Sequence, residues 1–109
     1  MDENPIIYEY QAKLLQTLGQ PVRLKIINLL KEGPECVTGI AEKIGEKQPT
    51  VSRHLMVLRS AGILSRHREG AEVHYAITSP KIVEVCDMMR AILTEQESHH
   101  LEIFKSLVA

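Results

Sequence analysis

Between Lys47 and Arg68 the chain carries five basic side chains and no acidic one, although the whole protein of 109 residues has a formal net charge of −1. The other eight Lys and Arg residues share the rest of the chain with all fourteen Asp and Glu residues. A protein that is acidic elsewhere but basic along one segment has the charge distribution of a polyanion-binding protein. The basic residues of this segment are Lys47, Arg53, Arg59, Arg66 and Arg68.

The first part of this segment reads Gln-Pro-Thr-Val-Ser-Arg-His-Leu over residues 48–55. A Gln side chain pairs with adenine, an Arg side chain binds guanine or phosphate, and short hydroxyls bind phosphates or bases. These side-chain types predict contact with duplex DNA, whereas the alternative is a solvated helix face. The expected DNA contacts are Lys47, Gln48, Thr50, Ser52, Arg53 and His54, with Arg66 and Arg68 on the DNA backbone.

Two helices joined by a tight turn are expected to position these side chains. Val51, Leu55 and Leu58 recur at i, i+4 and i+7 in a helix from about 48 to 60, which predicts that they face inward. The other faces of this helix carry Thr50, Arg53, His54 and Val57. A shorter helix near 37–44 precedes it and stops at Gly45, so residues 37–61 are a helix-turn-helix candidate.

The remaining elements complete a single domain over residues 1–109, mainly α with a small β-hairpin. Two alternating segments within about 63–77 flank a short turn containing Gly70, which predicts a hairpin. Helical spacing predicts a first helix at 6–18 and a second that begins at Pro21. A last helical region over about 80–106 is compatible with one long helix or two. Helix, turn, helix and hairpin in this order predict a winged helix-turn-helix.

The same residues resemble the ArsR/SmtB family of prokaryotic transcriptional repressors, and the resemblance covers about residues 12–93. The helix-turn-helix part of the match is highly specific. The matching stretches are Pro21-Val22-Arg23-Leu24, Glu35-Cys36-Val37, Ile40-Ala41, residues 48–55, Leu58-Arg59, Ala61-Gly62-Ile63-Leu64 and Tyr75.

This resemblance implies a homodimer that binds a palindromic DNA operator and releases it on binding an inducer, commonly a metal or metalloid ion. It assigns the helices at 6–18 and 80–106 to the dimer interface, in agreement with their surplus of apolar residues. It also places Thr50, Ser52, Arg53 and His54 in the recognition helix. Two departures from the family pattern predict weaker DNA contact at the wing tip and an uncapped recognition helix: Ala71-Glu72 replaces a frequent Arg, and Lys47 replaces a frequent capping Ser.

Cys36 and Cys86 are the only thiols, and they are the candidate inducer-sensing residues. The resemblance implies that a Cys at position 36 can bind a thiophilic metal or metalloid ion, although Thr38 stands where a second Cys is common. The family's other common metal site maps onto Ser79, Lys81, Ile92 and Glu95, so that zinc site is absent. By the same resemblance, Cys86 lies near its two-fold mate. A redox or sulfur-sensing pair and two ordinary buried thiols are the alternatives.

The histidines near the C-terminus offer a weaker metal candidate. Glu95 and His99 have i, i+4 spacing, and His100 follows directly. A solvated helix end is the favoured interpretation of this cluster.

The composition excludes several functional classes. Two distant Cys residues do not form a secreted disulfide scaffold, Asp2 and Glu3 do not open a signal peptide, and no apolar stretch approaches the ~18 residues of a membrane span. We therefore expect a cytoplasmic protein without membrane contact. No catalytic triad or phosphate loop accompanies Cys36, so an enzyme is not expected. The alternatives to an inducer-released repressor are a regulator without a sensor and a protein-interaction winged helix.

Overall fold

The computed structural model describes residues 4–108, and the side chains of residues 97–99, 101 and 104 lie outside that description. The helices expected from the sequence are present, and the last helical region is one helix. In chain order the elements are α1 (Ile6–Leu18), α2 (Pro21–Leu30), β1 (Glu35–Cys36), α3 (Val37–Ile44), α4 (Gln48–Ser60), β2 (Leu64–Glu69), β3 (Glu72–Ile77) and α5 (Pro80–Val108).

The core lies between α2, α3, α4 and the sheet, and it is built almost entirely from aliphatic side chains. Val51, Leu55 and Leu58 of α4 are fully buried, which confirms the inward face expected from their spacing. Ile26 and Ile27 of α2 are 0% and 1% exposed and pack in the same cluster. Close packing of such side chains fixes α4 against the helices beneath it.

A left-handed glycine produces the turn of the helix-turn-helix. Gly45 has φ +73°, and its backbone N–H donates to the carbonyl of Ala41, so α3 ends there. Glycine adopts this conformation without the steric cost of a side chain. Only Glu46 and Lys47 lie between Gly45 and the start of α4, and α3 and α4 pack against each other.

The sheet has three strands rather than the two expected from the sequence. Its order is β1-β3-β2 and both pairings are antiparallel. The additional strand is β1, where Glu35 pairs with Tyr75 and Cys36 with His74. A two-residue strand is too short to produce the alternating pattern that identified β2 and β3, which explains why the sequence did not predict it.

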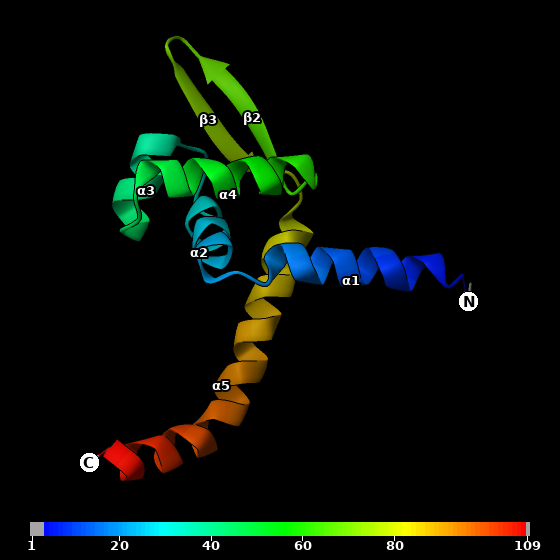
Figure 1. Ribbon diagram of the computed structural model, residues 1–109, viewed down its shortest axis with the longest axis vertical. Helices are drawn as coiled ribbons and strands as arrows, with labels where there is room; N and C mark the ends of the chain where they lie inside the picture. The colour runs from blue at the N-terminus through cyan, green and yellow to red at the C-terminus, as the bar shows by residue number, and fades with distance from the viewer. Residues whose placement is uncertain (1–3, 109) are drawn as a thin grey trace.

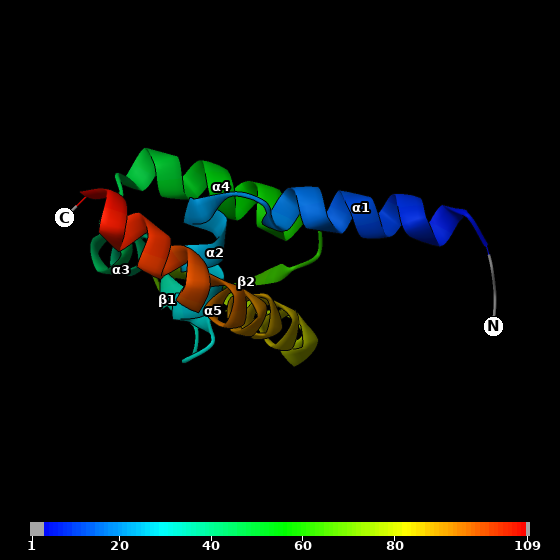
Figure 2. The ribbon, with the colours of Figure 1, turned by 90° about the horizontal axis from the view of Figure 1, so that it is seen from below.

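Helices α1 and α5 project from this body (Figures 1 and 2). Leu18 is the one buried residue of α1, and Cys86 is a buried residue of α5. Large apolar side chains on both helices remain exposed: Ile6, Ile7, Tyr8, Tyr10, Leu14, Leu15, Val85, Met88, Ile92, Leu93, Ile103, Leu107 and Val108. The metal candidate formed by Glu95 and His99 involves the His99 side chain, which lies outside the described residues.

None of the described helices is both long enough and apolar enough to cross a bilayer.

Candidate nucleic-acid interface

The outward face of α4 carries most of the side chains that the sequence suggested for DNA contact. Lys47, Gln48, Ser52 and Arg53 are exposed, and Thr50 is partly exposed. Figure 2 places α4 along one edge of the molecule, with α2 and α3 to one side of it. The helix spans 13 residues, or about 20 Å at 1.5 Å per residue, which suits the major groove.

The start of α4 lacks a side-chain cap. Lys47 occupies the N-cap position and makes no capping hydrogen bond, and Pro49 lies in the first turn, where a missing N–H costs nothing. The backbone N–H groups of this turn therefore have no intrahelical or capping partner.

The expectation that His54 lies on an outward face is wrong. His54 is 9% exposed, and it is the one buried polar or charged residue among those the structure describes. Its Nδ1 atom accepts a hydrogen bond of 3.1 Å from Nε of Arg23 on α2. Burial, reinforced by the charges of Arg23 and Arg53, lowers the pKa of His54, so the ring is neutral at neutral pH. A buried, hydrogen-bonded imidazole is not available to base edges.

Met56 is an outward-facing residue that the sequence did not single out. It is 67% exposed on α4. Arg53 and Arg59 lie three residues away on either side, and Ser52 and Ser60 lie four away, all of them exposed. Residues at these spacings share a helix face, so Met56 lies in the middle of a polar and basic surface. A search for hydrogen-bonding side chains overlooks such a residue because it has no strong donor or acceptor.

The wing places its basic residues away from its tip. Arg66 and Arg68 are exposed on β2, where Arg66 pairs with Tyr75 and Arg68 with Val73. At the tip, Glu69 pairs directly with Glu72. Two opposed carboxylates repel a phosphate, whereas the two arginines attract one.

The two cysteines occupy different environments. Cys36 is a partly exposed thiol at the N-cap of α3, whereas Cys86 is 9% exposed on α5. Burial, with a smaller contribution from the charge of Asp87, raises the pKa of the Cys86 thiol. A raised pKa leaves less thiolate, which is the reactive form. The structure therefore separates a partly exposed thiol from a buried one.

Strand register puts His74 beside Cys36 and His67 on the far side of His74. Cys36 pairs with His74, which pairs with His67 on its other side, so the three residues form a row across one sheet face. His67 Nε2 lies 3.1 Å from Ser65 Oγ, and His74 Nε2 lies 3.9 Å from Glu72 Oε2. Within the described part of the chain, no group of three His, Cys, Asp or Glu residues is placed to hold a metal ion.

Glu35 fixes the backbone next to Cys36. Its carboxylate accepts a hydrogen bond of 2.9 Å from the Cys36 N–H and forms an ion pair with Lys43. The hydrogen bond from Lys43 and that from Cys36 together lower the pKa of the Glu35 carboxyl. A Cβ atom at position 39 would lie 2.5 Å from Cδ of Glu35, so Gly39 leaves the space that this carboxylate occupies.

Comparison with known proteins agrees with this geometry. Residues 20–66 match the model of the arsR family of bacterial regulatory proteins. The chain is 39% identical to the transcriptional repressor PagR of Bacillus anthracis over 77% of its own length and 85% of that protein. The PagR crystal structure superposes with a TM-score of 0.68 and covers 77% of this chain and 97% of PagR.

Two further solved structures have the same fold. The winged helix-turn-helix domain of Mb0332 from Mycobacterium bovis, described as homodimeric, gives a TM-score of 0.76 at 26% identity, covering 87% of this chain and 88% of that one. The AntR antimony-specific transcriptional repressor gives 0.78 at 27% identity, covering 90% of each chain. With its exposed basic helix and wing, this chain belongs to the ArsR family, whose members are DNA-binding transcriptional repressors and not enzymes.

Proposed function

We propose that this protein is a homodimeric repressor that binds a palindromic DNA operator through α4 and the wing. The observation that carries the proposal is the two-sided character of α4. One side supplies Val51, Leu55 and Leu58 to the core, and the other presents Gln48, Ser52 and Arg53 to solvent. In this proposal Lys47, Gln48, Thr50, Ser52 and Arg53 contact DNA in the major groove, and Arg66 and Arg68 hold phosphates.

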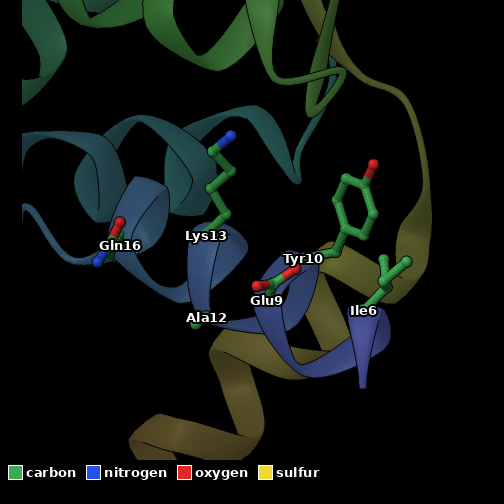
Figure 3. A pocket seen from close by; sticks show the side chains of 6 residues that line it. All are labelled: Ile6, Glu9, Tyr10, Ala12, Lys13 and Gln16. Atoms are coloured by element: carbon green, nitrogen blue, oxygen red, sulfur yellow. The ribbon is translucent and has the colours of Figure 1, made fainter. Parts of the chain in front are cut away.

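The homodimer is proposed from the uncovered apolar surface of α1 and α5. A hollow on α1 is lined by side chains of that helix alone, among them Ile6, Tyr10 and Lys13 (Figure 3). Tyr10 and Lys13 extend from one side of the helix and Ala12 from the opposite side. A hollow lined by a single helix is too open to enclose a small molecule, but a second helix can pack against it. A second copy would cover this surface and give the complex two-fold symmetry.

Two-fold symmetry has a direct consequence for the DNA sequence. Two α4 helices related by a two-fold axis enter successive major grooves, so the half-sites lie about one helical turn apart and are inverted copies of each other. Doubling the exposed basic residues on one side of the complex also strengthens its attraction for phosphates.

Selection from random duplexes tests this proposal. Bound duplexes are recovered at low salt, sequenced and used to measure stoichiometry by analytical ultracentrifugation. We expect an inverted repeat bound by two chains. Recovery of no enriched duplex, with the protein folded and dimeric, would favour the alternative of a protein-interaction winged helix.

The inducer is proposed to be a thiol-reactive species that acts at Cys36, with Cys86 as a buried thiol of the interface. Support comes from the partial exposure of Cys36 and its location at the end of β1, where it is also the N-cap of α3. A ligand bound there would move the first helix of the helix-turn-helix relative to the wing.

A release assay on the selected duplex tests the inducer proposal. Arsenite, cadmium, zinc, a persulfide and peroxide are added in turn, and the fraction of bound DNA is followed. Cys36→Ser is expected to abolish release by the active compound, and Cys86→Ser serves as the matched control. Equal release from wild type and Cys36→Ser, or no release by any compound, would support a repressor without a sensor at this thiol.

A further inference from the structure

Arg23 joins two helices that have separate roles in the proposed repressor. Its Nε donates to His54 Nδ1 at 3.1 Å, in the middle of α4, and its Nη1 donates to the backbone carbonyl of Thr17 at 3.0 Å, in the last turn of α1. Arg23 itself lies on α2 and is half-buried. One side chain therefore bridges the recognition helix and the N-terminal helix.

Each bond suits its partner chemically. The last carbonyls of a helix have no intrahelical donor and carry partial negative charge, so a guanidinium at Thr17 is favourable. On the other side, His54 is neutral because burial disfavours its charged form, and Nδ1 keeps the lone pair that accepts the Arg23 proton. The guanidinium is planar, with its N–H groups in fixed directions, so two bonds from one group fix both partners in orientation.

Few other contacts hold α1 to the body. Leu18 is its single buried residue, next to Thr17, and the other α1 side chains from Ile6 to Gln16 are exposed. In Figure 1 the rest of α1 extends away from the body. The angle of α1 is thus determined at its C-terminal end, where the Arg23 bridge lies.

We propose that Arg23 is a positioning residue that, through His54 and Thr17, sets the angle between α1 and α4 and thereby the half-site spacing that the dimer accepts. This inference rests on the proposed function, because it requires α1 in the dimer interface and α4 in the DNA. The angle between α1 and α4 within one subunit fixes the distance between the two α4 helices across the two-fold axis. Inserting one base pair changes the half-site separation by about 3.4 Å and rotates one half-site around the duplex.

The test measures spacing preference separately from half-site affinity. Operators with the selected spacer, and with one base pair added or removed, are compared with a duplex carrying one half-site. The key variants are His54→Leu and His54→Asn, because the Leu and Asn side chains have nearly the same shape. Asn keeps an acceptor where Nδ1 lies, whereas Leu removes it. Ile27→Val, a small core truncation that touches neither bond, controls for a general loss of stability.

We expect wild type and His54→Asn to bind operators with an altered spacer about tenfold more weakly than the operator with the selected spacer. This factor lies within the range of interaction energies between residues of one hydrogen-bonded network. His54→Leu should reduce this discrimination to about threefold or less while its affinity for the single half-site stays unchanged. Arg23→Lys, which keeps the charge but not the two-armed geometry, is expected to behave like His54→Leu and replaces it if that variant does not fold.

Wild-type spacing discrimination in both His54→Leu and Arg23→Lys would overturn the proposal, as would an equal loss in Ile27→Val. Failure of the proposed function is a distinct result, because wild type would then bind no duplex of any spacing.

Discussion

The helix-turn-helix body and the two projecting helices differ in how much of their apolar surface the chain itself covers. In the body, Leu55 and Leu58 are fully buried. On α1, by contrast, Ile7 is 56% exposed and Tyr10 66%, and Ile92 on α5 is 47% exposed. The two regions have a similar aliphatic composition, so the difference lies in what is available to pack against them.

This difference separates two tasks. The body buries its own core and holds α4 in place, so one chain alone positions the proposed recognition helix. The projecting helices leave apolar side chains in water, where each fully buried Leu or Ile would contribute roughly 1.5–3 kcal/mol. In the proposed dimer a second copy covers these side chains, and dimerisation brings two recognition helices together.

The largest expected effect comes from blocking the projecting surface. Leu15→Glu puts a charge on the exposed face of α1, and the protein is expected to sediment as a folded monomer. Loss of bivalent binding should weaken affinity for the full operator by about 100-fold or more. Glu9→Gln, an exposed change on the same helix, is the control. A dimer that survives Leu15→Glu would remove this residue from the proposed interface.

Truncation inside the body should act on folding instead. Leu58→Ala deletes a fully buried side chain and is expected to cost about 2–5 kcal/mol of unfolding free energy in urea. Met56→Ala, two residues earlier and exposed, should change stability by less than about 0.5 kcal/mol. Equal effects of the two changes would contradict the two-sided description of α4.

Arg53→Ala tests the outward face of α4 without disturbing the core. Affinity for the selected duplex is expected to fall by about 1–3 kcal/mol, with the dimer intact in gel filtration. Lys25→Ala removes the same charge from the exposed surface of α2 and is expected to change binding much less. Dissociation of the Arg53→Ala dimer would be inconsistent with a role in DNA contact.

A smaller effect is expected at Met56, whose exposed apolar side chain is of the type that packs against a thymine methyl group in the major groove. Replacing the contacted thymine by uracil removes that methyl alone and should weaken wild-type binding by about fourfold, the value of one buried carbon at roughly 0.8 kcal/mol. The same replacement should be neutral for Met56→Ala. Persistence of the full uracil penalty in Met56→Ala at every thymine would assign the methyl contact to another residue.

The smallest effect concerns the pH dependence of the body. Burial lowers the pKa of His54 from its ordinary value of 6.5. As the pH falls, the unfolded chain therefore protonates this residue at a higher pH than the folded chain does. Stability therefore falls as pH drops through this value, and this contribution does not change with pH well above it. Urea midpoints at about pH 7.5 and 5.5 should differ more for wild type than for His54→Leu. Identical differences would exclude His54 as a source of the pH dependence.

Local pattern predicted the helices well and the long-range contacts poorly. The spacing of Val51, Leu55 and Leu58 identified the inward face of α4, and Gly45 marked the end of α3. His54 was misassigned because its partner Arg23 lies 31 residues earlier, so no local pattern reveals the bond. The strand at Glu35–Cys36 and the row from Cys36 to His67 depend on pairing register, which the sequence does not display.

The central claim is that two subunits bind one duplex through α4 and the wing. The salt dependence of operator binding tests this claim most directly. Each neutralised phosphate contributes a slope of about −0.9 in a plot of log K against log salt concentration. If Lys47, Arg53, Arg66 and Arg68 supply the contacts, two subunits should give a slope between about −4 and −7 with two chains per duplex. A slope near zero, or no binding to duplex DNA at low salt, would contradict the account.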